Sequence, residues 1–289
     1  MRGHDAGTVN PFHGQCRLAD LGVLTARGRD AVPFLQGQLS QDVTRLDAHA
    51  WRYAGYHNPQ GRVIAVLRLV PAVDGVHCVL PRELVAAVAA RLRRYVLRAK
   101  VTLADDSEVL QVIGAVHEDR RRELRIEPAP GGAVDDAALA ARAAWRALDI
   151  AAGLPQVYPA TSEVFVAQML NLDLVGGIAF DKGCYTGQEI VARAHYRGRV
   201  KRRMQRFRAA TGSRTALVPG STGRLADGRA FQVVDAVALA DGDTEFLAVA
   251  PLTAADPAAP GELAQDAPRE PAATPVEARS LPLPYALPD

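Results

Sequence analysis

Short apolar runs of strand length recur between residues 16 and 117, and an amphipathic helical segment interrupts them. The run at 63–70 is rich in β-branched residues and follows the turn signal Asn58-Pro59-Gln60-Gly61, which predicts a β-hairpin. Residues 81–97 begin with a proline and carry apolar residues three and four positions apart: Leu84, Val88, Leu92 and Tyr95. Strands mixed with helices in this order predict an α+β fold.

The second half of the chain starts with another helical segment and continues in strands. Residues 136–152 have a helical pattern and end at Gly153 and Pro155, the usual order of stop signals. From residue 200 onward, short apolar runs between glycine turns predict a small β-barrel or sandwich. Residues 252–278 are rich in proline and alanine and predict a disordered loop, after which the apolar terminus LPLPYAL is expected to pack back onto the protein.

The composition is that of an ordinary globular protein. The 289 residues are 48% hydrophobic, enough for a buried core without a disulfide or a structural metal. Cys16, Cys78 and Cys184 show no spacing typical of a disulfide framework or a zinc site, so we expect a protein of the reducing cytoplasm that holds no metal. No run approaches the roughly 18 apolar residues that a membrane span requires, and we expect no membrane partner.

The segment from residue 178 to 204 carries the most chemistry. Thr186 and Glu189 have the spacing of a capping box, which predicts a helix from Gly187 to about His195. Cys184 precedes this helix by a few residues, and the helix dipole together with the Lys182 ammonium would favour its thiolate form. The alternative interpretation is that Cys184 is a small buried residue in a tight turn.

A strongly basic run, Arg193–Arg208, follows the cysteine. It holds eight cations in sixteen residues and no acid. Such a run is typical of a solvated strand face, but it also suits the binding of nucleic-acid phosphates or of a ligand with several carboxylates. Only Tyr196 and Phe207 are aromatic within it, fewer than a platform for single-stranded RNA requires.

These residues resemble a known family. The motif KGCYTGQE at 182–189, followed by IVARAHYRG and KRR, is similar to the signature of the YgfZ family of folate-binding proteins, which is related in fold to the aminomethyltransferase (T-protein) of the glycine cleavage system. Further segments resemble the family in the same order, so that the resemblance covers nearly the whole chain; they are residues 34–43, 58–62, 97–103, 143–155, 167–173 and the terminal LPYAL.

The resemblance implies an aminomethyltransferase-like fold around a central cavity that holds tetrahydrofolate. It also implies a role in making or maintaining iron–sulfur clusters of certain client enzymes, and through one of them in tRNA modification. Lys182 and Cys184 match the functional lysine and cysteine of the signature, Trp145 matches a folate-binding tryptophan, and Leu21 stands where the family has a second tryptophan. The expected folate contacts also include four signature residues: Tyr185, Gln188, Glu189 and Arg193.

The resemblance also predicts the domains. We expect a folate-binding α+β region over residues 14–195, built from 14–75 with 130–195 and from 76–129. The C-terminal β-barrel is expected to comprise 196–251 and 279–289, with the loop 252–278 inserted between them.

Two other functions remain open at this point. Aminomethyltransferases carry an acidic pair on the strand after the glycine turn, where general acid/base catalysis at folate needs a carboxylate. Here Ala65 and Val66 occupy those positions, so transfer of a one-carbon unit is disfavoured. Direct tRNA binding through the basic run is the other alternative, although we expect the run to receive the glutamate carboxylates of folate instead.

Overall fold

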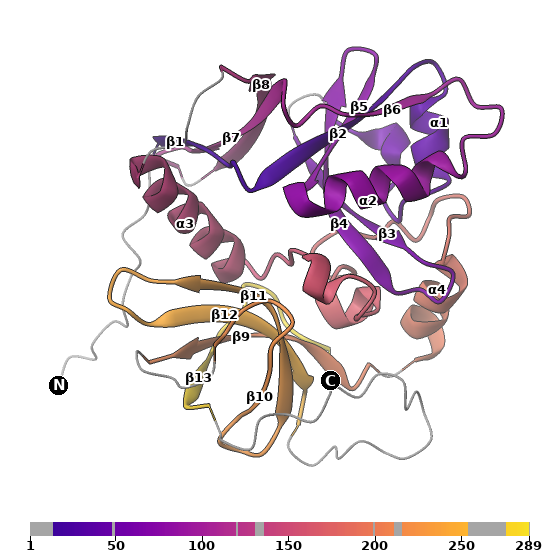
Figure 1. Cartoon of the computed structure of the whole chain (residues 1–289). Helices are drawn as coiled ribbons and strands as arrows, with labels where there is room; N and C mark the ends of the chain where they lie inside the picture. Colours follow the sequence, from indigo (N-terminus) through magenta and orange to yellow (C-terminus); the bar gives the residue numbers. More distant parts are fainter. Residues whose placement is uncertain are drawn as a thin grey trace.

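The computed structural model describes residues 14–47, 50–119, 121–130, 136–198, 200–210, 216–253 and 276–288. Three antiparallel sheets and four helices make up the described part of the chain (Figure 1). Short 3-10 turns at Val43–Arg45, Pro159–Thr161 and Ala167–Leu170 connect some of these elements.

The N-terminal sheet has five strands in the order β3-β4-β5-β2-β6. The helix α2 (Arg82–Arg93) packs on this sheet, and α1 (Ala31–Gln36) contacts β5 (Figure 1). The strands are β2 (Leu21–Arg27), β3 (Arg52–His57), β4 (Val63–Ala72), β5 (Gly75–Pro81) and β6 (Thr102–Asp105).

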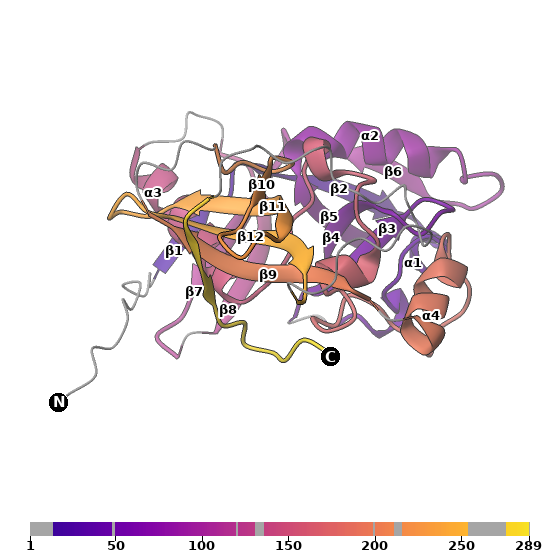
Figure 2. The same cartoon turned by 90° about the horizontal axis from the view of Figure 1, so that it is seen from below.

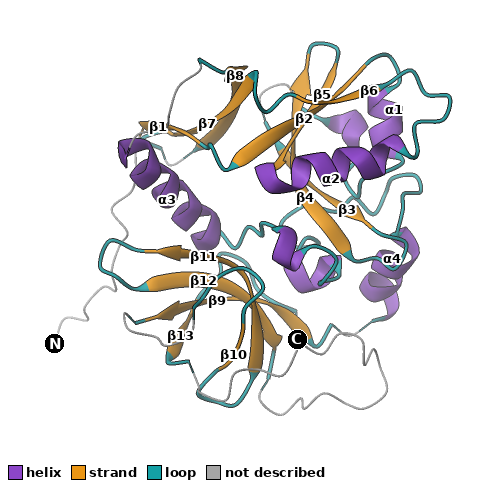
Figure 3. Cartoon of the chain, viewed as in Figure 1, coloured by secondary structure: helices purple, strands orange, loops and turns teal. Residues whose placement is uncertain are grey.

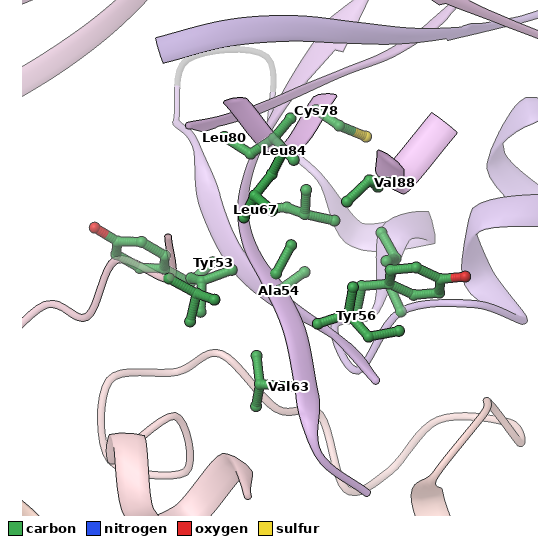
Figure 4. Packing of buried hydrophobic residues seen from close by; sticks show 14 of the residues in the cluster. Tyr53, Ala54, Tyr56, Val63, Leu67, Cys78, Leu80, Leu84 and Val88 are labelled. Atoms are coloured by element: carbon green, nitrogen blue, oxygen red, sulfur yellow. The ribbon is translucent and has the colours of Figure 1, made fainter. Parts of the chain in front are cut away.

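The largest core lies on this sheet. Every residue of β4 from Val63 to Leu69 is buried, because other parts of the protein cover both faces of the strand. Figure 4 shows Leu67 and Ala54 of neighbouring strands beside Leu84 of α2. The apolar run recognised in the sequence is therefore a strand buried on both faces.

A three-stranded sheet, in the order β1-β7-β8, carries the third helix. Its strands are β1 (Gly14–Arg17), β7 (Leu110–Val116) and β8 (Arg122–Pro128), and α3 (Asp136–Ala151) packs on β1. Gly114 of β7 faces the Trp145 ring, and a Cβ at Gly114 would lie 2.7 Å from a ring carbon. A glycine is thus required where the helix approaches the sheet.

The C-terminal strands form a five-stranded antiparallel sheet in the order β10-β11-β12-β9-β13. Its core holds the clustered rings of Phe207, Phe231 and Phe246, and Figure 2 shows the sheet beside the N-terminal sheet. The strands are β9 (Arg202–Ala209), β10 (Thr222–Arg224), β11 (Ala230–Ala238), β12 (Thr244–Pro251) and β13 (Ala278–Leu281).

The expected C-terminal barrel is an open sheet among the described residues. Its edge strands β10 and β13 are three and four residues long and each pairs with one neighbour. A single backbone bridge between Leu225 and Val276 joins the two edges, which is too little pairing to close a barrel.

Most predicted elements are present. The hairpin of β3 and β4 turns at Asn58 and Gly61, and α3 ends before Gly153 (Figure 3). The helix α2 ends at Arg93, however, so Tyr95 lies in the following turn and is 47% exposed instead of continuing the apolar face. The strand β8 had no counterpart among the expected elements.

The proline- and alanine-rich segment and the C-terminus lie against the C-terminal sheet where they are described. Residues 254–275, most of the expected loop, lie outside the described residues. Val276 is buried and Ala278 begins β13. The Tyr285 hydroxyl donates a hydrogen bond to the Gly153 carbonyl oxygen at 2.7 Å, which confirms that the apolar terminus packs back onto the protein. Within the described part of the chain, no helix is long and apolar enough to span a membrane.

Candidate functional site

The signature loop, residues 182–187, is fixed by the side chain of Lys182. Its Nζ atom donates hydrogen bonds to the backbone carbonyl oxygens of Gln36, Leu39 and Gln41, at 2.7, 2.6 and 2.9 Å. An ammonium has three donors, so all of them are used by the last residue of α1 and the loop that follows it. Burial lowers the pKa of Lys182 to about 8. The lysine therefore ties two loops together.

Cys184 is exposed, in contrast to the other two cysteines. Cys16 and Cys78 are buried, and burial raises the pKa of their thiols to about 11 and about 12. A Cβ at the neighbouring Gly183 would meet nothing within 4 Å, so the loop is open to the surface there. The structure thus excludes the interpretation of Cys184 as a buried residue. No group of three or more potential metal ligands occurs among the described residues.

The helix α4 (Gln188–Arg197) follows the loop, but the expected capping box is wrong. Gly187 is the N-cap, its backbone is left-handed with a φ of 81°, and no side chain caps the helix. A Cβ at Gly187 would lie 2.6 Å from the carbonyl oxygen of Asn58. This close approach to the β3–β4 hairpin requires glycine, and it moves the start of the helix one residue beyond the predicted position.

The four other signature residues lie around the start of α4. Tyr185 is buried, and its ring lies 6.0 Å from the ring of His57 and 5.1 Å from the Lys182 ammonium. The backbone N–H of Gln188 donates to the carbonyl oxygen of Tyr185 at 3.2 Å. Glu189 and Arg193 are exposed on the helix.

His57 is a buried histidine beneath this loop that sequence reasoning missed. Its side chain is 1% exposed, and neither ring nitrogen has a hydrogen-bond partner among the described residues. Burial lowers its pKa to about 4. The ring packs against Gly55, and the His57 Cβ lies near Gly187. In the sequence, the sign of this site was the histidine directly before the NPQGR turn.

A small cavity of about 20 Å³ lies where the three sheets meet, and we call it the central cavity. Its walls come from α3, β4, β11 and the segments around residues 18–21 and 156–158. Leu21 and Trp145, two of the expected folate contacts, both line it. The signature residues do not: the lining comprises Leu18, Asp20, Leu21, Arg68, Arg142, Trp145, Arg146, Asp149, Gln156, Tyr158 and Asp235.

One wall of the central cavity is a buried ion network. Arg68, 2% exposed, donates to Asp149 at 2.7 Å and to the Gln156 side-chain oxygen at 2.8 Å. Arg122 donates to the second oxygen of Asp149 at 2.6 Å. Two guanidinium groups thus share one carboxylate, which leaves net positive charge beside the cavity.

A second buried pair also lines the central cavity. Asp235 is 1% exposed, and Arg146 Nε donates to its carboxylate at 2.6 Å. The Tyr158 hydroxyl lies 3.4 Å from the same oxygen. Burial raises the pKa of Asp235 to about 6, although the guanidinium opposes that shift.

Three polar atoms around the central cavity have no hydrogen-bond partner among the described residues. They are Asp20 Oδ1, Trp145 Nε1 and Gln156 Nε2. Arg142 approaches Asp20 only at 3.8 Å. Buried polar groups without partners are rare in folded proteins, because each costs the free energy of its lost hydration. Among the described residues, one hydrogen-bond acceptor and two donors at the central cavity therefore have no partner.

The charged members of these walls were not expected from the sequence. Arg68 and Asp235 each interrupt an apolar strand, in LRL and VVDAV, and a charge at such a position signals a buried pair. The sequence does not show which acid meets which base.

Much of the basic run is neutralised within the C-terminal sheet. Arg203 pairs with Asp173 at 2.9 Å, Arg206 with Glu245 at 2.7 Å, and Arg208 with Asp243 at 2.7 Å. Phe207 lies in the core. Arg199 lies outside the described residues. Among the residues that the structure describes, Arg193 and Arg197 on α4 are exposed and have no such pair.

Comparison with known proteins gives the family. No family model matches the chain. A tRNA-modifying protein YgfZ from Enterobacter sp. (strain 638) is 34% identical over 64% of this chain and 68% of that protein. The YgfZ protein of Edwardsiella ictaluri (strain 93-146) is 32% identical over 81% of this chain and 83% of that protein.

The fold has a solved counterpart. The glycine cleavage system aminomethyltransferase T from Bartonella henselae matches with a TM-score of 0.60 and 14% identity, covering 84% of this chain and 80% of that one. This match confirms the expected aminomethyltransferase-like α+β fold. On the sequence identity and coverage of its relatives, the chain belongs to the family of the tRNA-modifying protein YgfZ.

Proposed function

We propose that the protein is a cytoplasmic tetrahydrofolate-binding accessory protein that supports the iron–sulfur clusters of client enzymes, and that the central cavity receives the pterin ring. The observation that carries the folate assignment is the set of unpartnered atoms on Asp20, Trp145 and Gln156. A pterin carries N–H donors beside ring nitrogen and oxygen acceptors. A carboxylate oxygen and two N–H donors complement such an edge.

The indole of Trp145 contributes its N–H to this site. The guanidinium of Arg122 lies over the ring at 5.2 Å, and Gly114 packs against the ring carbons. The indole N–H has no hydrogen-bond partner among the described residues. Leu21 supplies an apolar wall, since its side chain packs against a ring but donates no hydrogen bond.

The cavity is small. It holds about 20 Å³, room for about one water molecule, whereas ligand pockets commonly measure roughly 300–1,000 Å³. Binding of a bicyclic ring therefore requires the side chains of the cavity walls to move apart. We assign the glutamate carboxylates of folate to Arg142, which lines the cavity and whose side chain is 32% exposed.

Cys184 has a separate role in this proposal. The lining of the central cavity includes no residue of the signature loop, and Cys184 faces the surface. We therefore assign Cys184 to contact with a client enzyme, and assign the effect on tRNA modification that the names of the relatives imply to that client. Ala65 and Val66, buried within β4, offer no group for transferase catalysis.

Tryptophan fluorescence tests the folate site, because the chain has two tryptophans. Trp51 packs edge-on against Tyr53 and is absent from the cavity lining, so it is a matched control. Tetrahydrofolate should quench the wild type and Trp51→Phe, and should leave Trp145→Phe unquenched. Loss of the indole N–H should weaken binding about fivefold to 100-fold. Quenching that survives in Trp145→Phe and disappears in Trp51→Phe would refute the assignment.

A further inference from the structure

Residues 94–100 form an exposed basic turn after α2. Arg94, Arg98 and Lys100 are exposed, and no acid occurs between residues 91 and 104. Within the described part of the chain, the side chains of these three residues make no hydrogen bond and no ion pair. Their charges are therefore available to a partner, unlike those of the arginines on β9.

The exposed face of α4 offers the same chemistry. Arg193 and Arg197 are one helical turn apart and exposed, and neither side chain has a hydrogen bond or ion pair among the described residues. Tyr196 is 69% exposed and lies one turn from Arg193. Its ring is held edge-on against His195, with the centroids 4.8 Å apart.

Aromatic rings occur beside both groups of cations. Tyr95 stands between Arg94 and Arg98 and is 47% exposed. On α4, His195 stacks on Phe180 at 3.8 Å and supports Tyr196 in turn. The sequence showed too few aromatic residues in the basic run, because Phe180 precedes the run and Tyr95 lies in another segment.

The β3–β4 hairpin connects the two groups. Beside its turn, the Asn58 side chain donates a hydrogen bond to Glu163 at 2.9 Å, and Arg91 of α2 donates to the other oxygen of the same carboxylate. At the tip of the hairpin, a Cβ on Gly61 would lie 2.7 Å from the Ile190 Cβ of α4. Figures 1 and 2 both show the turn after α2 and the helix α4 at the same side of the molecule. We call this surface the basic edge; it comprises Arg94, Tyr95, Arg98, Lys100, Arg193, Tyr196 and Arg197.

We propose that the basic edge is a binding site for single-stranded RNA. Single-strand sites combine cations that contact phosphates with aromatic rings on which bases stack, and both occur here on one surface. An acidic protein would use the five cations equally well, but it would gain little from two exposed tyrosines set among them. This proposal is independent of the folate assignment, since the basic edge and the central cavity share no residue.

The test is fluorescence anisotropy with a labelled single-stranded RNA of twelve nucleotides at several salt concentrations. Each phosphate contact on a single strand adds about 0.7 to the slope of log K against log salt. Arg94→Ala/Arg98→Ala should therefore lower the slope by about 1.4. The matched control is Arg121→Ala/Arg279→Ala, which removes two exposed cations far from the basic edge and should leave the slope unchanged.

The tyrosines separate RNA from other anionic partners. Tyr196→Ala should weaken RNA binding about fivefold or more, and Tyr196→Phe should retain it because the ring remains. Equal binding by Tyr196→Ala, or equal slopes for the two arginine pairs, would overturn the proposal. Displacement of the RNA by polyglutamate of equal charge, with no effect of Tyr196→Ala, would instead assign the basic edge to an acidic protein.

Discussion

Arg68 in the central cavity and Lys182 in the signature loop are both withdrawn from bulk water, but they are compensated differently. Arg68 is 2% exposed and meets the carboxylate of Asp149. Lys182 is half-buried and meets three backbone carbonyl oxygens. An ion pair fixes a charge inside a rigid wall, whereas a lysine on carbonyls joins two loops. The charges of the cavity wall are thus fixed in place, and the signature loop is held so that it presents an exposed thiol.

The largest expected effect is the difference in alkylation rate between the exposed cysteine and the two buried cysteines. Cys184 should react with iodoacetamide at least about a thousandfold faster than Cys16 and Cys78, because a buried thiol reacts only after unfolding. Mass spectrometry of peptides from the folded protein at neutral pH measures the three rates. Comparable rates in the folded protein, followed by equal rates in urea, would contradict the exposed position of Cys184.

Arg68→Met tests the rigid wall of the cavity. It leaves Asp149 with one guanidinium partner and should lower the free energy of unfolding by about 3–5 kcal/mol, the usual result of breaking a buried ion pair. Urea denaturation at pH 7 measures it. Arg121→Met, at an exposed arginine, is the control and should change stability by less than about 0.5 kcal/mol. If Arg68→Met lowers the unfolding free energy as little as the control does, Arg122 alone compensates the buried charge of Asp149.

Lys182→Met tests the tie between the two loops. Three carbonyl oxygens lose their donor, and we expect a loss of about 2–3 kcal/mol in unfolding free energy. The rate of Cys184 alkylation should change little, because the ammonium donates all its hydrogen bonds to the carbonyls. A strongly slowed alkylation with unchanged stability would mean that Lys182 acts on the thiol, as the sequence suggested.

His57 should make the region beneath the signature loop sensitive to acid. Its pKa is lowered to about 4 in the folded protein, so the unfolded chain takes up the proton first as the pH falls from about 6.5. Between pH 7 and pH 5 the folded protein should lose on the order of 2 kcal/mol through this residue. Urea denaturation of wild type and His57→Gln at both pH values measures the difference, with His117→Gln as the control at a half-buried position. If the unfolding free energies of wild type and His57→Gln change with pH in the same way, His57 does not cause the acid sensitivity.

Local patterns in the sequence predicted the elements well and their contacts poorly. The apolar run at 63–70 and the helical spacing of 81–97 are properties of neighbouring residues, and both elements are present, although α2 ends at Arg93. The start of α4 was misplaced because Gly187 is required by Asn58, a residue distant in the sequence.

The candidate site was predictable only where a motif marked it. Cys184 and Lys182 stand in the signature, and Trp145 stands in a family segment. The pairing of Arg203 with Asp173 and of Arg146 with Asp235 joins different parts of the chain, so the sequence left the basic run looking free and the cavity walls unmarked. A charge within an apolar strand is visible in the sequence, but its partner is set by tertiary structure.

The two glycines that separate α4 from the β3–β4 hairpin have an evolutionary consequence. Gly187 lies against Asn58, and Gly61 lies against Ile190, so each motif contains a glycine whose missing side chain makes room for the other. A mutation in the NPQGR turn is therefore constrained by the cysteine motif, and the reverse holds as well. We expect the two motifs to be inherited as a single unit, and a cysteine loop transplanted to another scaffold without its hairpin to lose its shape.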